Sequence, residues 1–179
     1  VENVKAYLRD LLAHRRTHPD EAKPGEILTA LAEAEEDGKK LTELELLHQC
    51  IFLLNAGHET STNMISHGIH EMLRHPDQIA CLQADPNLIE SAVEEILRYH
   101  APIQINNRRA LVDTELSGML IPAGTIAHLM IAGANRAPAQ FPDPNTFDIA
   151  RRPNRHLSFG LGIHVCIGNT LARIEGRIA

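Results

Sequence analysis

The residues with the clearest chemical potential lie in the stretch FGLGIHVCIG, from Phe159 to Gly168, which contains Cys166. Gly160, Gly162 and Gly168 leave little side-chain bulk around this cysteine. Glycine readily adopts positive φ angles and allows another group to approach the backbone closely. The pattern therefore predicts a loop against which a flat molecule can dock.

A helix is predicted directly after this loop, because Leu171, Ile174 and Ile178 recur at helical spacing. Cys166 would then lie just before a helix N-terminus, where free backbone N–H groups favour an anion such as a thiolate. An ionised cysteine is a nucleophile or a metal ligand, whereas a cysteine packed in apolar surroundings is an inert thiol. The residues around Cys166 leave both interpretations open.

A second unusual pattern interrupts the longest periodic segment. Thr42 and Glu45 form a capping box that predicts a helix over residues 42–74, ended by Pro76. The first half of this helix is apolar on several faces, as expected for a buried element. Its apolar residues are Leu46, Leu47, Ile51, Leu53 and Leu54.

The middle of the same helix reads AGHETST over residues 56–62, with small residues, an acid and hydroxyls where a buried helix would be apolar. One interpretation is a kink in which threonine hydroxyls bond back to carbonyl oxygens. The other is a functional site, because local conflicts with folding preference often mark function.

A third pattern lies in the helix predicted over residues 88–99. Glu95 and Arg98 share one face at i and i+3 and can form an ion pair. On the surface such a pair contributes less than about 1 kcal/mol, and the neighbouring Glu94 is expected to be a solvated acid of this kind.

The histidine-rich end of the long helix offers the alternative of a zinc site, because it contains His67, His70, Glu71 and His75. Zinc hydrolases place histidines at i and i+4 around a glutamate, whereas His75 follows His70 at i+5. This spacing argues against a zinc centre.

Together these motifs resemble those of the cytochrome P450 family. The cysteine loop is similar in its phenylalanine, glycine and histidine positions before Cys166 and in the glycine after it. The resemblance extends to the AGHETST segment and to the ExxR pattern of Glu95 and Arg98. It implies a mainly α fold of the P450 type with a small β region, of which this chain is a part.

The resemblance also implies a haem b cofactor whose iron has the Cys166 thiolate as its axial ligand. It implies that Arg108 and His164 contact the haem propionates, although the adjacent Arg109 leaves the choice of arginine open. The other residues implied to contact haem or the space above it are Ala56, Gly57, Phe159 and Gly160.

By the same resemblance, Thr60 hydrogen-bonds dioxygen and Glu59 helps to relay protons from solvent, which makes these two the catalytic residues. Arg151 is implied to join Glu95 and Arg98 in a buried charge network that stabilises the cysteine loop. Residues lining the substrate pocket are implied at Ile103, Gln104 and Ile105.

The implied reaction is insertion of one oxygen atom from O₂ into a small organic substrate. The implied electron donors are a ferredoxin and its NAD(P)H-dependent reductase. Two alternatives are a non-catalytic or degenerate haem-binding fragment and a peroxide-using relative. Thr60 and Glu59 favour the dioxygen reaction, since a peroxide-driven enzyme does not need the same proton relay.

Composition excludes several other classes. The 179 residues include 44% hydrophobic and 22% charged residues, ordinary values for a globular protein. The net charge of −6 argues against a nucleic-acid partner. No apolar run approaches the roughly 18 residues of a membrane span. Cys50, Cys81 and Cys166 form no CxxC pair, which favours a reducing compartment, the cytoplasm.

The remaining pattern predicts helices over residues 2–16 and 26–36, a short helix after Pro76, and short strands between Ile103 and Ile121. Residues 126–135 are expected to form a helix or turn. We expect residues 1–179 to form a single partial domain, truncated at both ends, with the N-terminal and C-terminal parts of the fold missing.

Overall fold

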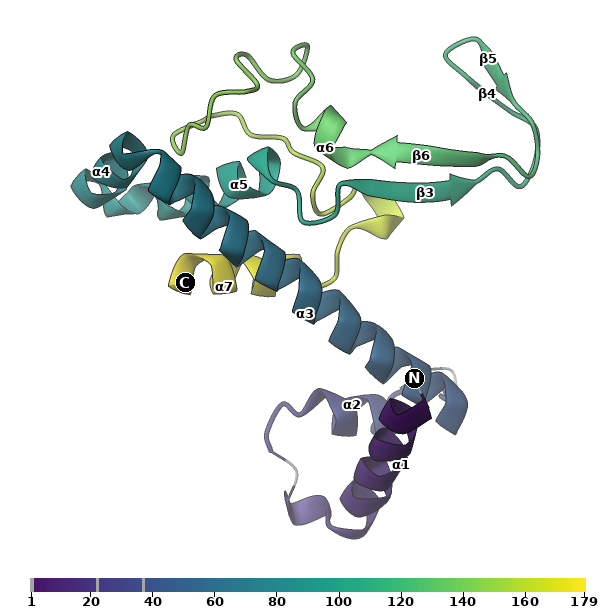
Figure 1. Ribbon diagram of the computed structural model, residues 1–179. Coiled ribbons are helices and arrows are strands. Elements are labelled where there is room, and N and C mark those ends of the chain that lie inside the picture. The colour runs from purple at the N-terminus through teal and green to yellow at the C-terminus, as the bar shows by residue number, and fades with distance from the viewer. Residues whose placement is uncertain (1, 22, 37) are drawn as a thin grey trace. The chain divides into compact units, whose positions relative to one another are not determined.

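The computed structural model describes residues 2–21, 23–36 and 38–179. These residues form mainly helices with short antiparallel strand pairs, so the prediction of a mainly α chain with a small β region is confirmed (Figure 1). The chain divides into two units, one up to His58 and one from Glu59 onward, which are described separately.

The first unit has a small core in which Leu12 packs against Leu46 and Leu47. The helix expected over residues 26–36 is shorter than predicted, because the chain forms a strand pair around Gly38, whose φ of 74° suits a tight turn. Asp37, the other residue expected to end that helix, lies outside the described residues. The elements are α1 (Glu2–Thr17), η1 (Pro19–Glu21), α2 (Ile27–Glu33), β1 (Glu35–Glu36) and β2 (Lys39–Lys40).

The long helix α3 (Glu43–Arg74) begins and ends where the sequence predicts. The capping box is confirmed: Glu45 N donates to Thr42 Oγ1 at 3.3 Å, and Thr42 N donates to Glu45 Oε2 at 2.8 Å.

The expectation that the first half of α3, apolar on several faces, is a buried element is wrong for the described residues. Leu46 and Leu47 are buried, but Phe52 is 60% and Leu54 61% exposed. An apolar helix face is buried only where another element packs against it. The sequence pattern does not identify that element.

The helix α5 (Ile89–Tyr99) is central to the second unit, because it contributes to two apolar clusters. Val93 and Leu97 pack with Met64, while Ala92 packs with Phe147 and with Ile149. The helical elements that follow α3 are α4 (Pro76–Ala84), η2 (Pro86–Leu88), α5 (Ile89–Tyr99), α6 (Ile131–Ala134), η3 (Gly162–His164) and α7 (Asn169–Ile178).

The helix α7 packs closely on this core at Gly176. A Cβ added there would lie 3.1 Å from the side chains of both Met64 and Val93. Only glycine therefore lets α7 approach α3 and α5 to this distance without rearrangement.

The described strands of the second unit form two antiparallel pairs. β3 (Ile105–Arg109) pairs with β6 (Ile126–Met130). β4 (Thr114–Leu116) pairs with β5 (Met119–Ile121) in a hairpin that lies beyond the C-terminal end of β3 (Figure 1). The helix or turn expected over residues 126–135 is therefore wrong for its first half. The pairing partner of β6 lies about 20 residues earlier in the chain, and a short apolar run does not reveal such a partner.

Between α6 and η3 the chain follows an irregular path, coloured green to yellow-green in Figure 1, and ends at the loop that contains Cys166. Among the helices of the described residues, none is long and apolar enough to cross a lipid bilayer.

Candidate functional site

The loop around Cys166 is closed by its own backbone. Cys166 N donates to Phe159 O at 2.8 Å, and Gly160 N donates to Leu157 O at 2.8 Å. Gly160 has a φ of 70°, and a Cβ there would lie 2.9 Å from the carbonyl oxygen of His164. The fold therefore requires glycine at this position.

The glycines of this loop have different roles. Gly162 has a positive φ of 65°, as expected, but Gly168 has a φ of −85° and is the residue that precedes α7. Cys166 consequently lies two residues before the N-cap of α7, as the sequence predicts.

The surroundings of Cys166 are apolar and open. Cys166 is an exposed free thiol, so its interpretation as an inert cysteine packed in the core is wrong. Its neighbours Leu161, Ile163 and Ile167 are 79%, 96% and 89% exposed. Exposed apolar side chains around a thiol fit a flat, largely apolar cofactor that sulfur ligates, and haem is such a group.

The other predicted cofactor contacts in the second unit lie on different elements. His164 is exposed at the end of η3, and Phe159 packs against the cluster of Met64. Arg108 is exposed on β3, where its Nη1 donates to Asn107 O at 2.8 Å. Successive strand residues face opposite sides, so Arg108 and Arg109 begin on opposite faces of β3.

The residues of the AGHETST segment lie in α3, which is helical throughout this segment. Ala56 and Gly57 belong to the first unit, and Glu59 and Thr60 begin the second. Glu59 is exposed and Thr60 half-buried.

A contact that the sequence did not reveal lies next to Thr60. Ser61 Oγ donates to Glu175 Oε2 at 2.6 Å, which joins α3 to the helix that follows the cysteine loop. The partners are 114 residues apart, so no local pattern could have indicated this bond.

The predicted substrate-lining residues Ile103, Gln104 and Ile105 lie at the start of β3. Ile103 is 44% and Ile105 48% exposed. Gln104 O accepts a hydrogen bond from Ala132 N at 3.1 Å, which links this segment to α6.

The structure brings Glu95 and Arg98 together with both side chains fully buried. Arg98 Nε and Nη2 donate to the two oxygens of Glu95, each at 2.7 Å. The remaining N–H groups of Arg98 donate to the backbone oxygens of Asn135, Pro144 and Thr146. All five guanidinium donors are thus satisfied, so the alternative of a surface pair is wrong.

Arg151 completes this network, with its Nε 3.2 Å from Glu95. Its other nitrogens donate to Pro142 O and to Thr146 O, so it joins α5 to the irregular segment. Asn154, which the sequence did not indicate, donates from Nδ2 to Glu95 Oε2 at 3.0 Å. The network therefore connects α5 to the segment that leads to Cys166.

The prediction that Glu94 is a solvated surface acid is wrong. Its Oε1 accepts from Arg173 Nε at 2.6 Å, and its Oε2 lies 3.1 Å from His156 Nε2. His156 Nδ1 accepts from Ser158 N, which leaves Nε2 to donate to Glu94. These partners are 79 and 62 residues away, beyond the reach of helical periodicity.

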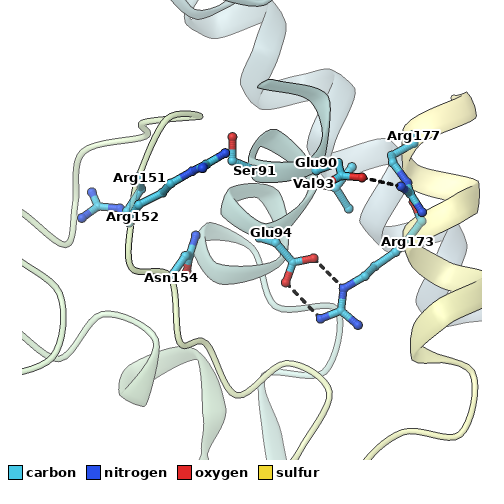
Figure 2. Close-up of a pocket in the computed structure, with 9 residues that line it drawn as sticks. All are labelled: Glu90, Ser91, Val93, Glu94, Arg151, Arg152, Asn154, Arg173 and Arg177. Atoms are coloured by element: carbon cyan, nitrogen blue, oxygen red, sulfur yellow. Dashed lines mark hydrogen bonds and ion pairs between the residues drawn. The ribbon is translucent and has the colours of Figure 1, made fainter. Parts of the chain in front are cut away.

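A groove of about 550 Å³ lies beside the contacts of Glu94 with Arg173 and His156 (Figure 2). Figure 2 shows two ion pairs between α5 and α7 at its edge: Glu94 with Arg173, and one turn earlier on α5, Glu90 with Arg177. Its remaining lining residues are Ser91, Val93, Arg151, Arg152 and Asn154.

Glu94 is expected to make the stability of the folded chain depend on pH in the acid range. Burial opposes its ionisation, but the hydrogen bonds from His156 and Arg173 outweigh burial and lower its pKa from 4.5 to about 2. A carboxyl group with a lowered folded-state pKa stabilises the fold above pH 4.5, and this contribution is lost as pH falls towards 2. We expect it to be on the order of 2 kcal/mol, after allowance for partial solvent screening.

The measurement is urea unfolding of the parent protein and of the Glu94→Gln variant at several pH values. The parent should be more stable at pH 6, and the difference should vanish near pH 2. A difference that stays constant over this range would contradict the prediction.

Comparison with known proteins places these features in one family. The family model described as cytochrome P450 matches residues 1–179. The cytochrome P450 monooxygenase PikC of Streptomyces venezuelae is 46% identical over 181 residues, which cover all of this chain and 42% of that protein. A vitamin D(3) 25-hydroxylase of Pseudonocardia autotrophica is 45% identical over 177 residues, 98% of this chain and 43% of that protein.

A solved structure shows the same fold. P450BioI, in complex with an acyl carrier protein ligated to hexadec-9Z-enoic acid, matches with a TM-score of 0.91 and 42% identity, over 99% of this chain and 44% of that chain. The chain thus spans less than half the length of the relatives it matches, and the prediction of a partial P450 fold is confirmed. Its sequence over its whole length, and its structure, show that the chain belongs to the cytochrome P450 family.

Proposed function

We propose that the protein containing this chain is a haem-thiolate monooxygenase that inserts one oxygen atom from O₂ into a small organic substrate. The observation that carries the proposal is the position of Cys166, an exposed thiol on a closed loop whose neighbouring apolar side chains are exposed. Membership of the cytochrome P450 family supports the same reaction class.

In this proposal Cys166 Sγ ligates the iron of haem b, and Phe159 and Gly160 form the loop surface under the macrocycle. Arg108 and His164 donate to its carboxylates. Bound haem supplies an iron centre at which dioxygen is activated. The small residues Ala56 and Gly57 leave space on α3 for dioxygen and substrate.

Thr60 and Glu59 relay protons to the site, because insertion of one oxygen atom from O₂ releases the other as water and consumes two protons and two electrons. The exposed carboxylate of Glu59 can take a proton from solvent, and the hydroxyl of the adjacent Thr60 can donate one within the site. This acid and hydroxyl on one turn of α3 favour the dioxygen reaction over a peroxide-driven one.

The substrate proposed is a small, largely apolar molecule. Ile103 and Ile105 present apolar surface at the start of β3, with Gln104 between them. The relatives include a protein named for hydroxylating vitamin D(3) and one complexed with a carrier-bound fatty acid. Electrons are proposed to come from a ferredoxin and its NAD(P)H-dependent reductase. The free cysteines support a cytoplasmic location.

The first test is the absorption spectrum of the purified chain with haem, reduced and exposed to carbon monoxide. A strongly red-shifted Soret band is expected from a thiolate ligand. In parallel, haem should protect Cys166 from alkylation but leave the exposed Cys81 reactive, which provides an internal reference. The same measurements on a chain extended at both ends to the length of its relatives separate a site that cannot bind haem from a fragment too short to do so.

Thr60→Ala should uncouple electron consumption from product formation, because the variant lacks the hydroxyl that supplies the proton. We expect product per NAD(P)H to fall about tenfold or more, with electron uptake largely retained. Product and NAD(P)H consumption are measured together in the extended protein, with ferredoxin and reductase supplied and a substrate found by screening.

The matched control is Ser61→Ala, which removes the neighbouring hydroxyl, whose partner is Glu175. This variant should stay coupled. Tight coupling in Thr60→Ala would contradict the role proposed for Thr60. Undiminished turnover of the parent with hydrogen peroxide alone would favour the peroxide-using alternative.

A further inference from the structure

We propose that Arg173, anchored by Glu94, is a positioning residue that holds both ends of the Cys166 loop and thereby keeps the sulfur in place for the iron. The inference rests on the proposed haem-thiolate function and adds a residue that the ExxR network does not include. It is carried by three sets of contacts, all within the second unit.

The first contact lies at the beginning of the loop. The guanidinium carbon of Arg173 lies 4.5 Å from the centroid of the Phe159 ring, a cation–π arrangement. Phe159 O in turn accepts the hydrogen bond from Cys166 N at 2.8 Å. A residue that fixes the Phe159 ring therefore also fixes the carbonyl that closes the loop on the cysteine.

The second contact lies at the end of the loop. Arg173 Nη1 donates to Asn169 Oδ1 at 2.9 Å, and Asn169 Nδ2 donates to Cys166 O at 2.6 Å. Both backbone groups of Cys166 are thus hydrogen-bonded, its N–H to Phe159 and its C=O to Asn169. Arg173 contacts both of these partners.

The third contact provides a rigid anchor. Arg173 Nε and Nη2 donate to the two oxygens of Glu94 at 2.6 and 3.0 Å, the bidentate geometry that best fixes a guanidinium plane. Glu94 directly precedes the fully buried Glu95 on α5, so its backbone lies in a packed helix. The hydrogen bond to Glu94 is also the main cause of the raised pKa of Arg173, which therefore stays charged.

The chain contains a matched pair that lacks these contacts. Arg177 lies four residues after Arg173 on α7 and pairs with Glu90, four residues before Glu94 on α5 (Figure 2). Arg177 otherwise donates only to Arg173 O among the hydrogen bonds of the described residues. The two pairs join the same helices with the same charges, and only one of them contacts the loop.

The first experiment measures hydrogen exchange of the Cys166 amide in the haem-free extended protein, which has the length of the relatives. Arg173→Gln should accelerate this exchange about tenfold, because the loop opens more often when both end contacts are lost. Arg177→Gln should leave it unchanged, and the amide of the buried Ile149 reports whether each variant remains folded. Equal rates in the parent and in folded Arg173→Gln would overturn the proposal.

Three further variants separate the effect of charge from that of geometry. Glu94→Gln should accelerate the exchange as Arg173→Gln does, and the double variant should add little, because the two residues act as one unit. Arg173→Lys should restore only part of the protection, since an ammonium group cannot make the bidentate contact. Full protection in Arg173→Lys, or additive effects in the double variant, would contradict an anchored arginine.

The second experiment tests the consequence for the sulfur. The haem-loaded protein is reduced under carbon monoxide, and the decay of its red-shifted Soret band is followed over time. The decay rate in Arg173→Gln should be about tenfold higher than in Arg177→Gln. Equal lifetimes would show that the arginine does not position the thiolate. If the parent fails to bind haem, the proposed function fails while the exchange experiment still decides whether Arg173 holds the loop.

Discussion

The Cys166→Ser variant should lose the strongly red-shifted Soret band completely when the haem-loaded protein is reduced under carbon monoxide. A serine hydroxyl remains protonated near neutral pH, whereas a cysteine can supply the thiolate that ligates the iron. The substitution removes no buried contact, because Cys166 is exposed and its backbone bonds to Phe159 and Asn169 do not depend on its side chain. The expected effect is therefore on the ligand and not on the fold.

The matched controls are Cys81→Ser and Cys50→Ser, which replace the other free cysteines of the chain. Both variants should keep the red-shifted band. Haem content and thermal unfolding are recorded for all variants, so that a lost band is assigned to the missing thiolate and not to unfolding. A thiolate-type band that persists in Cys166→Ser would refute the assignment of the axial ligand.

The second large effect is expected from Glu95→Gln, which should destabilise the protein by about 3–5 kcal/mol. The substitution keeps the shape of the side chain but leaves the guanidinium of the fully buried Arg98 without its counter-charge. It also weakens the bonds to Arg151 and to Asn154, which hold the segment leading to the cysteine loop. Urea unfolding at neutral pH measures the loss.

Two variants calibrate this result. Glu90→Gln, on the same helix but 73% exposed at the side chain, should change stability by less than about 1 kcal/mol. Arg151→Lys should be intermediate, because Glu95 keeps its bidentate contact with Arg98. A cost for Glu95→Gln no larger than that of Glu90→Gln would show that the buried network contributes little to stability.

The acid prediction for Glu94 and the exchange prediction for Arg173 test different consequences of the contacts of Glu94. The first measures how much its contacts with His156 and Arg173 together stabilise the folded chain. The second measures what the contact between Glu94 and Arg173 does to the loop. A variant could lose stability without a faster Cys166 exchange, and that outcome would reduce Glu94 to a structural role.

The family motifs were predictable without the structure, because each of them is local. The order of glycine, histidine and cysteine in the loop, the capping box at Thr42 and the i, i+3 spacing of Glu95 and Arg98 all lie within a few residues of chain. Helix boundaries next to Pro76 were predictable for the same reason, since proline and the capping residues act on their immediate neighbours. These features sufficed to predict a mainly helical P450-type chain.

Which of these residues share an environment depends on contacts between distant parts of the chain. Glu94 looked like a solvated acid because its partners, His156 and Arg173, are more than 60 residues away. The local pattern of residues 126–130 predicts a helix or turn and not the strand β6, because it does not identify β3 as a pairing partner. The exposure of Phe52 and Leu54 follows the same principle: hydrophobic periodicity indicates which face can be buried, but distant segments of the chain determine whether it is.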